Sequence, residues 1–200
     1  LSDLLNTLTS GTASGRARGL VQELAYLAMA ASPPIRRKMD ALLGQLRSEV
    51  AVAGTRLADF FRSFVRCAKE QSEEVGDYER QLRITRSTRS QPGWDAIEAK
   101  GENLLLSLKG VDEKLGELQQ GVLEVLGKKD ASQDGVASDL RDLVQAFNDR
   151  CAYLQEVIFD PEDDWVYWCS FTPQGDSFTL HGALLDVASV LSQELFNQKR

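Results

Sequence analysis

Side chains that build catalytic and metal sites are scarce in this chain. It has three cysteines (Cys67, Cys151 and Cys169) and a single histidine, His181, among 200 residues. The cysteines are too few and too widely spaced for a disulfide framework or for a zinc site with CxxC spacing. A reducing, cytoplasmic compartment is therefore the expected location. Because no Cys or Ser base partner is evident, we interpret His181 as an ordinary strand residue.

Motifs for catalysis are lacking as well. The sequence contains no glycine-rich phosphate loop, no HExxH, no nucleophile elbow and no cluster of His, Cys and Asp residues. The acidic run DPEDD at 160–164 lacks the ligand spacing of an EF-hand, so we interpret it as a solvated connector between a helix and a strand. We expect no catalytic residue, no cofactor site and no metal site within these 200 residues.

Long apolar runs are also absent. The longest candidate, LVQELAYLAMAAS, is interrupted by Gln22 and Glu23, and no run approaches the roughly 20 residues that cross a bilayer. We therefore expect no membrane insertion. The chain begins at Leu1 without the basic region and small-residue cleavage site of a signal peptide. We expect it to be a segment of a longer protein, trimmed at both ends.

Basic residues are fewer than acidic residues, and one segment has a concentration of them. The chain has 23 Lys and Arg against 30 Asp and Glu, a net charge of -7, which argues against nonspecific coating of nucleic acid. One basic row recurs every third residue, with no acid between Glu79 and Asp95. It consists of Arg80, Arg83, Arg86 and Arg89. Such a row in an exposed loop can bind the phosphates of a single strand; alternatively, its members pair with acids on neighbouring helices.

Helical periodicity is what the chain has in abundance. Apolar residues recur at intervals of three and four after Pro33-Pro34, after Pro92-Gly93 and again over 140–158. These patterns predict three long helices, and shorter ones are expected near 2–9 and 19–31, separated by a Gly/Ser-rich loop. The polar turn GKKDASQDG between the second and third long helices favours antiparallel neighbours. Cys67 and Cys151 fall on the apolar stripes, which predicts buried core positions for both.

Two stretches are not helical. The residues around Leu82, Ile84 and Thr85 favour a short extended piece followed by a loop. Over 165–172, large apolar residues occupy both alternating sets, and the turn PQGD leads into SFTLHG, which predicts a β-hairpin with apolar residues on both faces. The predicted fold is mainly α: a long antiparallel helical bundle with a short β-hairpin and a final helix near the C-terminus.

The closing segment FTLHGALLDVASVLSQELFNQKR resembles a stretch of DinG-type and XPD-like superfamily 2 DNA helicases. In that family small residues, a proline and Leu-Asp-Val precede a helix that ends in Leu-Phe and a basic residue, before a Ser-Ala-Thr motif. The upstream strand with Trp165 and Tyr167, the segment QLRIT and the long helix led by Trp94 are similar to the region after the DEAH box. Leu184 departs from the pattern, because the family commonly has proline there.

The resemblance implies a helical arch domain over 1–160, and a hairpin and helix over 161–200 that return to a motor domain outside this chain. It implies a 5′ to 3′ DNA helicase whose arch guides single-stranded DNA. ATP and magnesium would bind the parent enzyme, and an iron–sulfur cluster is compatible with the parent, but the residues that bind these groups in the family lie outside this segment.

Within this resemblance, the arginine row at Arg80, Arg83, Arg86 and Arg89 is the expected contact with single-stranded DNA. We also expect the C-terminal hairpin and helix to expose apolar surface and to favour self-association. A different class of protein remains open: a complete helical adaptor that presents an acidic surface to a protein partner. The coding sequence on either side of the segment distinguishes the two.

Overall fold

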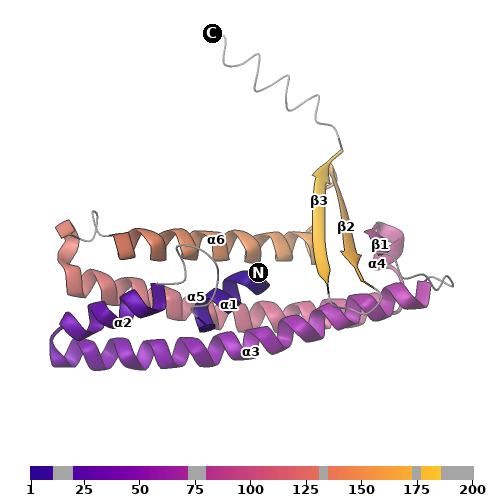
Figure 1. Ribbon diagram of the computed structural model, residues 1–200. Coiled ribbons are helices and arrows are strands. Elements are labelled where there is room, and N and C mark those ends of the chain that lie inside the picture. Colours follow the sequence, from indigo (N-terminus) through magenta and orange to yellow (C-terminus); the bar gives the residue numbers. More distant parts are fainter. Residues whose placement is uncertain (11–19, 72–79, 131–134, 173–176, 186–200) are drawn as a thin grey trace, which may run out of the picture. The chain divides into compact units, whose positions relative to one another are not determined.

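The computed structural model describes residues 1–10, 20–130, 135–172 and 177–185, apart from 72–79, and is mainly helical (Figure 1). The short helices are α1 (Ser2–Ser10), α2 (Leu20–Ala30) and α4 (Arg86–Arg89). The long helices are α3 (Pro33–Gln71), α5 (Trp94–Asp130) and α6 (Gly135–Ile158). The strands are β1 (Arg80–Ile84), β2 (Trp165–Phe171) and β3 (Phe178–Leu184). In the described ranges no helix is both long and apolar enough to cross a membrane.

The chain divides into two compact units that each take residues from both halves of the sequence. The first unit comprises Leu1–Asp59 and Gly101–Leu154, and the second comprises Phe60–Lys100 and Gln155–Arg200. The long helices α3, α5 and α6 therefore contribute to both units. The sequence predicted a different boundary, between an arch domain over 1–160 and a segment over 161–200 that returns to a motor domain. That boundary stays a prediction.

The first unit is an antiparallel helical bundle, as the periodicity predicted. Near the start of α3, Lys38 Nζ lies 3.0 Å from Glu124 Oε1 in the last part of α5. Eleven residues later on α3, Glu49 lies against Gly110, which precedes Glu124 on α5. Because the contacts run forward along one helix and backward along the other, the two helices are antiparallel. Buried Leu and Val residues on the predicted stripes fill the contact, each contributing about 1.5–3 kcal/mol when fully buried.

Glycine allows a close approach at one point of this bundle. A Cβ added at Gly121 on α5 would collide with the sulfur of Met39 on α3, whose side chain is fully buried. At Gly116, one turn and a half earlier on the same helix, a Cβ would meet nothing within 4 Å. Position 121 therefore leaves no room for a Cβ beside Met39, whereas position 116 does leave room for one.

The second unit contains a three-stranded antiparallel sheet in the order β1-β2-β3. The predicted hairpin is confirmed: Trp165 pairs with Leu184 at one end and Phe171 with Phe178 at the other. The predicted extended piece is β1, and it joins the hairpin as a third strand, with Arg80 opposite Phe171 and Ile84 opposite Tyr167. That pairing joins segments more than 80 residues apart, which local pattern does not specify.

One face of the sheet is covered by aromatic side chains of the second unit. Phe178 stacks on Phe61 with ring centroids 4.4 Å apart and lies 5.3 Å from Phe64. Phe64 also meets Trp94 edge-on at 5.7 Å. Cys67 and Cys169 are buried, whereas Cys151 on α6 is half-buried. The prediction of a buried core position is therefore confirmed for Cys67. Cys151 lies at the margin of the apolar stripe and is only half-buried.

Three predictions concern segments outside the described residues or differ from the structure in detail. The Gly/Ser-rich loop at 11–19 and the final helix within 186–200 lie outside the described residues. The turn GKKDASQDG begins later than predicted, because α5 continues to Asp130. Lys128 and Lys129 are good helix formers, so the local sequence supports this extension.

Candidate nucleic-acid interface

The arginine-bearing segment changes conformation in its middle. It begins as strand β1 and then enters α4, a single helical turn that the sequence predicted as a loop. Thr85 is the N-cap of this turn: its hydroxyl accepts a hydrogen bond of 3.1 Å from the Thr88 amide. The Thr88 hydroxyl in turn donates to the Arg83 carbonyl at 2.8 Å. The two threonines thus fix the turn directly after the strand.

The conformational change gives the arginines that the sequence places in one row different surroundings. Arg80 lies at the first position of β1, opposite Phe171, and its side chain lies outside the described part of the molecule. Arg83 is an exposed residue of β1, Arg86 is exposed at the start of α4, and Arg89 is half-buried at its end. Side chains that are three residues apart in the sequence form one straight row only where the backbone has three residues per turn.

Arg89 acts within the fold. Its Nη1 donates to the Ile158 carbonyl at 2.6 Å and its Nη2 donates to the Val157 carbonyl at 2.5 Å. Both carbonyls belong to the last turn of α6, where a cation also interacts favourably with the helix dipole. The guanidinium lies 5.0 Å from the ring centroid of Trp94. Burial lowers the pKa of Arg89, and the negative charge of Glu98 partly offsets this.

Arg83 and Arg86 face solvent instead. Arg86 Nη2 lies 2.9 Å from Asp163 Oδ1, but the two side chains are 93% and 88% exposed. An ion pair of that exposure contributes about 0–1 kcal/mol and is screened by salt. Arg83 forms no ion pair with the residues that the structure describes. Of the predicted row, these two arginines are therefore available to an anionic ligand.

A hollow of about 290 Å³ adjoins these arginines in the second unit. Arg83, Arg86 and the half-buried Arg89 line it together with Trp165 and Tyr167 of β2 and the acids Glu162 and Asp163. The Trp165 and Tyr167 rings are nearly parallel, 12° apart, with centroids separated by 6.2 Å. The hollow thus combines an aromatic wall, made of half-buried Trp165 and buried Tyr167, with two exposed guanidinium groups, whose charge the acids partly balance. An aromatic ring beside a cation suits a base and its phosphate.

Tyr167 is held firmly at the inner side of this hollow. Its hydroxyl donates a short hydrogen bond to Glu156 on α6 and accepts one of 3.3 Å from the Glu162 amide. Burial, followed by the hydrogen bond to Glu156, raises the pKa of Tyr167 to about 12. The phenol is therefore neutral at physiological pH and serves as a fixed support for Trp165. Alternation along β2 places the two rings on one face, but only the tertiary structure brings them beside the arginines.

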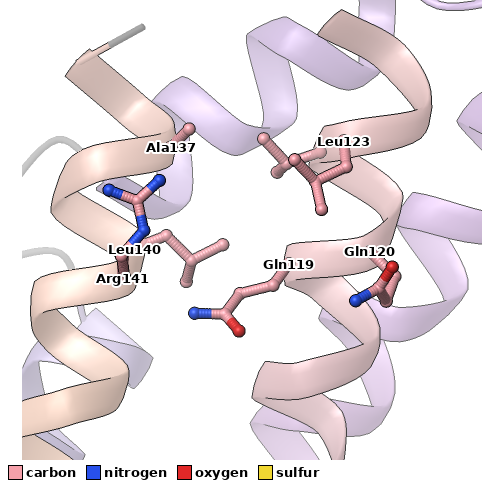
Figure 2. A pocket seen from close by; sticks show the side chains of 7 residues that line it. Gln119, Gln120, Leu123, Ala137, Leu140 and Arg141 are labelled. Carbon is pink, nitrogen blue, oxygen red and sulfur yellow. The ribbon is translucent and has the colours of Figure 1, made fainter. Parts of the chain in front are cut away.

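A second hollow, also of about 290 Å³, lies in the first unit between α5 and α6. Figure 2 shows Ala137, Leu140 and Arg141 of α6 across from Gln119 and Leu123 of α5. Its lining contains two amides and one cation but no acid, thiol or imidazole. These groups do not form a catalytic or metal-binding set.

Burial suppresses the reactivity of Cys151 and Cys169. Burial raises the pKa of the Cys169 thiol to about 12 and that of Cys151 to about 11, so both are protonated and poorly nucleophilic at neutral pH. His181 lies in β3, where its Nε2 is 2.9 Å from Ser170 Oγ. Among the described residues no three His, Cys, Asp or Glu side chains gather closely enough to hold a metal ion.

Compared with models of known families, with curated proteins and with solved structures, the chain matches none of them.

Proposed function

We propose that this chain is the arch segment of an ATP-dependent DNA helicase of the DinG and XPD type, where it guides single-stranded DNA. The observation that carries the proposal is the exposure of Arg83 and Arg86 at the rim of a hollow walled by Trp165. These two exposed cations lie beside an aromatic ring in a chain whose net charge is -7. The resemblance of the closing segment to the helicase family supports the same function.

In this proposal the segment binds but does not catalyse. ATP and magnesium belong to motor domains of the longer protein, and an iron–sulfur cluster, if the parent has one, is held there as well. The long helices have a structural role beside the path of the strand, and Arg89 anchors α6 rather than touching DNA. A cytoplasmic location fits the small number and wide spacing of the three cysteines.

The binding role is tested by the affinity of the chain for a single-stranded oligothymidine, measured by fluorescence anisotropy between 50 and 200 mM salt. Replacing both Arg83 and Arg86 with alanine removes two phosphate contacts. Because each contact on a single strand contributes about 0.7 to the slope of log affinity against log salt, the slope should fall by about 1.4. Affinity should fall most at low salt.

A matched control separates local contacts from net charge. Arg47 and Arg56 are exposed residues of α3 in the first unit, and replacing both with alanine removes the same charge. This control should leave the slope almost unchanged. Equal slopes for the Arg83/Arg86 variant and the unmodified chain would contradict the binding role. Flanking coding sequence without a phosphate loop, a DEAH box and a Ser-Ala-Thr motif would contradict the helicase assignment.

A protein-interaction adaptor is the second candidate, and one observation favours it. Tyr26 and Met29 of α2 are 72% and 59% exposed and lie three residues apart on one helical face. Exposed large apolar pairs of this kind fit a protein partner. If this function is correct, Tyr26→Ser combined with Met29→Ser should abolish partner capture in cells while strand affinity stays absent in every variant.

A further inference from the structure

The sheet of the second unit has a second face, to which only Arg83 and Val166 of the candidate site belong. Side chains alternate between the faces of a strand. Leu82, Ile84, Tyr167, Cys169 and Phe171 are buried on the covered face. The other positions form what we call the outer face: Gln81, Arg83, Val166, Trp168, Ser170, Thr179, His181 and Ala183. Within this set only Ser170 is buried.

Strand register aligns three functional side chains across the outer face. Arg83 of β1 lies opposite Trp168 of β2, which lies opposite His181 of β3. The Trp168 and His181 rings are stacked, 8° from parallel with centroids 4.9 Å apart. The contact of 2.9 Å between His181 Nε2 and Ser170 Oγ holds the imidazole in place. The row therefore consists of a fixed aromatic stack with an exposed guanidinium beside it.

Charge on the outer face differs from that of the chain as a whole. None of its eight residues is acidic, although the chain has 30 acids against 23 bases. The face is also too polar for a hydrophobic interface, since only Val166, Trp168 and Ala183 are apolar. A ligand that suits it has flat rings, hydrogen-bonding edges and negative charge. Single-stranded nucleic acid has all three.

We propose that the outer face binds the bases of single-stranded DNA. A base extends the stack of Trp168 and His181, and Arg83 binds the neighbouring phosphate. Arg83 also lines the hollow with Trp165, so a strand can pass from the hollow onto the outer face at this residue. The inference rests on the proposed function that the chain contacts single-stranded DNA, and it adds recognition of bases to the recognition of phosphates.

Abasic DNA tests the two contributions separately. An oligothymidine and an abasic strand of the same length carry the same phosphates, but only the first can stack. The unmodified chain should bind the oligothymidine more tightly. Trp168→Leu keeps an apolar side chain but removes the ring, so the preference for the oligothymidine should fall about 5- to 150-fold, the equivalent of one base stacked on an aromatic residue. The salt slope should not change, because Arg83 remains.

Trp168→Phe provides the matched control, since phenylalanine also stacks, and it should retain most of the preference. Circular dichroism shows whether each variant folds. A second measurement needs no destabilising change and uses the chain with 5-fluorotryptophan incorporated. The ¹⁹F resonance of Trp168 is assigned by its absence in Trp168→Phe. This resonance should shift when oligothymidine is added and should not shift when the abasic strand is added. This readout keeps the proposal testable if Trp168→Leu does not fold.

The outcomes separate this inference from the proposed function. If the two strands bind the chain equally and the salt slope depends on Arg83 and Arg86, phosphate binding stands and base binding by the outer face is wrong. An unshifted Trp168 resonance together with an unchanged preference in Trp168→Leu also overturns the base contact. If neither strand binds, both proposals fail.

Discussion

Replacing Arg89 with alanine is the sharpest test of the way the structure divides the arginine row. The change removes two hydrogen bonds from a cationic donor to the Val157 and Ile158 carbonyls and the contact with Trp94. Hydrogen bonds of a charged group contribute about 1.5–3 kcal/mol each, and a cation over an aromatic ring about 0.5–1 kcal/mol. Since Arg89 is half-buried, water can reach part of the site, so we expect a loss of about 2–3 kcal/mol in the free energy of unfolding.

The assay is urea denaturation at pH 7 followed by circular dichroism, with two comparison variants. Arg89→Lys keeps the charge but has no planar fork with which to bind both carbonyls, so it should recover about half of the loss. Arg86→Ala should cost no more than about 1 kcal/mol, because its ion pair with Asp163 is exposed. For a chain of this size each kcal/mol corresponds to about 2–4 °C in Tm, which gives a drop of about 4–12 °C for Arg89→Ala.

The reasoning is refuted by a specific combination of results. If Arg89→Ala unfolds at the same urea concentration as the unmodified chain and yet weakens strand binding as much as Arg86→Ala does, Arg89 faces the ligand. The four arginines would then act as the row that their spacing suggested. A loss of stability with unchanged strand affinity supports the placement of Arg89 against α6.

Two further predictions concern packing and pH. Gly121→Ala should lower the free energy of unfolding by about 1–3 kcal/mol in urea denaturation, because its Cβ collides with the buried Met39 sulfur. Gly116→Ala should instead raise it by up to about 1 kcal/mol through helix propensity. Equal effects of the two substitutions would contradict the close approach. The raised pKa values of Cys169 and Tyr167, about 12 each, mean that the folded chain holds protons that the unfolded chain releases above about pH 9–10. The free energy of unfolding should therefore fall as the pH rises from about 9 toward 12, and Cys169→Val should make that fall smaller; an unmodified chain whose free energy of unfolding does not fall over this range would contradict the burial.

Helices and strands were predictable from sequence because their signals are local. Intervals of three and four between apolar residues specify α3, α5 and α6, and the structure has these helices as an antiparallel bundle. The hairpin of β2 and β3 follows from alternation on either side of a short turn. The single turn α4 was missed, although its signal is present: Thr85 is a good N-cap and Thr88 follows three residues later.

The candidate site was predicted less completely. The sequence grouped Arg83 and Arg86 with Arg80 and Arg89 in one row, whereas the structure gives Arg89 different surroundings from Arg83 and Arg86. It gave no reason to place Trp165 beside those arginines or Trp168 beside Arg83. Each of these contacts depends on the pairing of β1 with β2, and the sequence of neither strand specifies which strand it pairs with.

The sequence by itself determined where the helices and strands lie and which side chains share a face, because the periods of 3.6 and 2.0 are properties of the local backbone. Only the tertiary structure decided which arginines meet solvent. A strand followed by a capped helical turn sends residues three apart in different directions, and α6 presents open carbonyls where Arg89 can reach them. That partner is nearly 70 residues away along the chain, beyond the range of any local pattern.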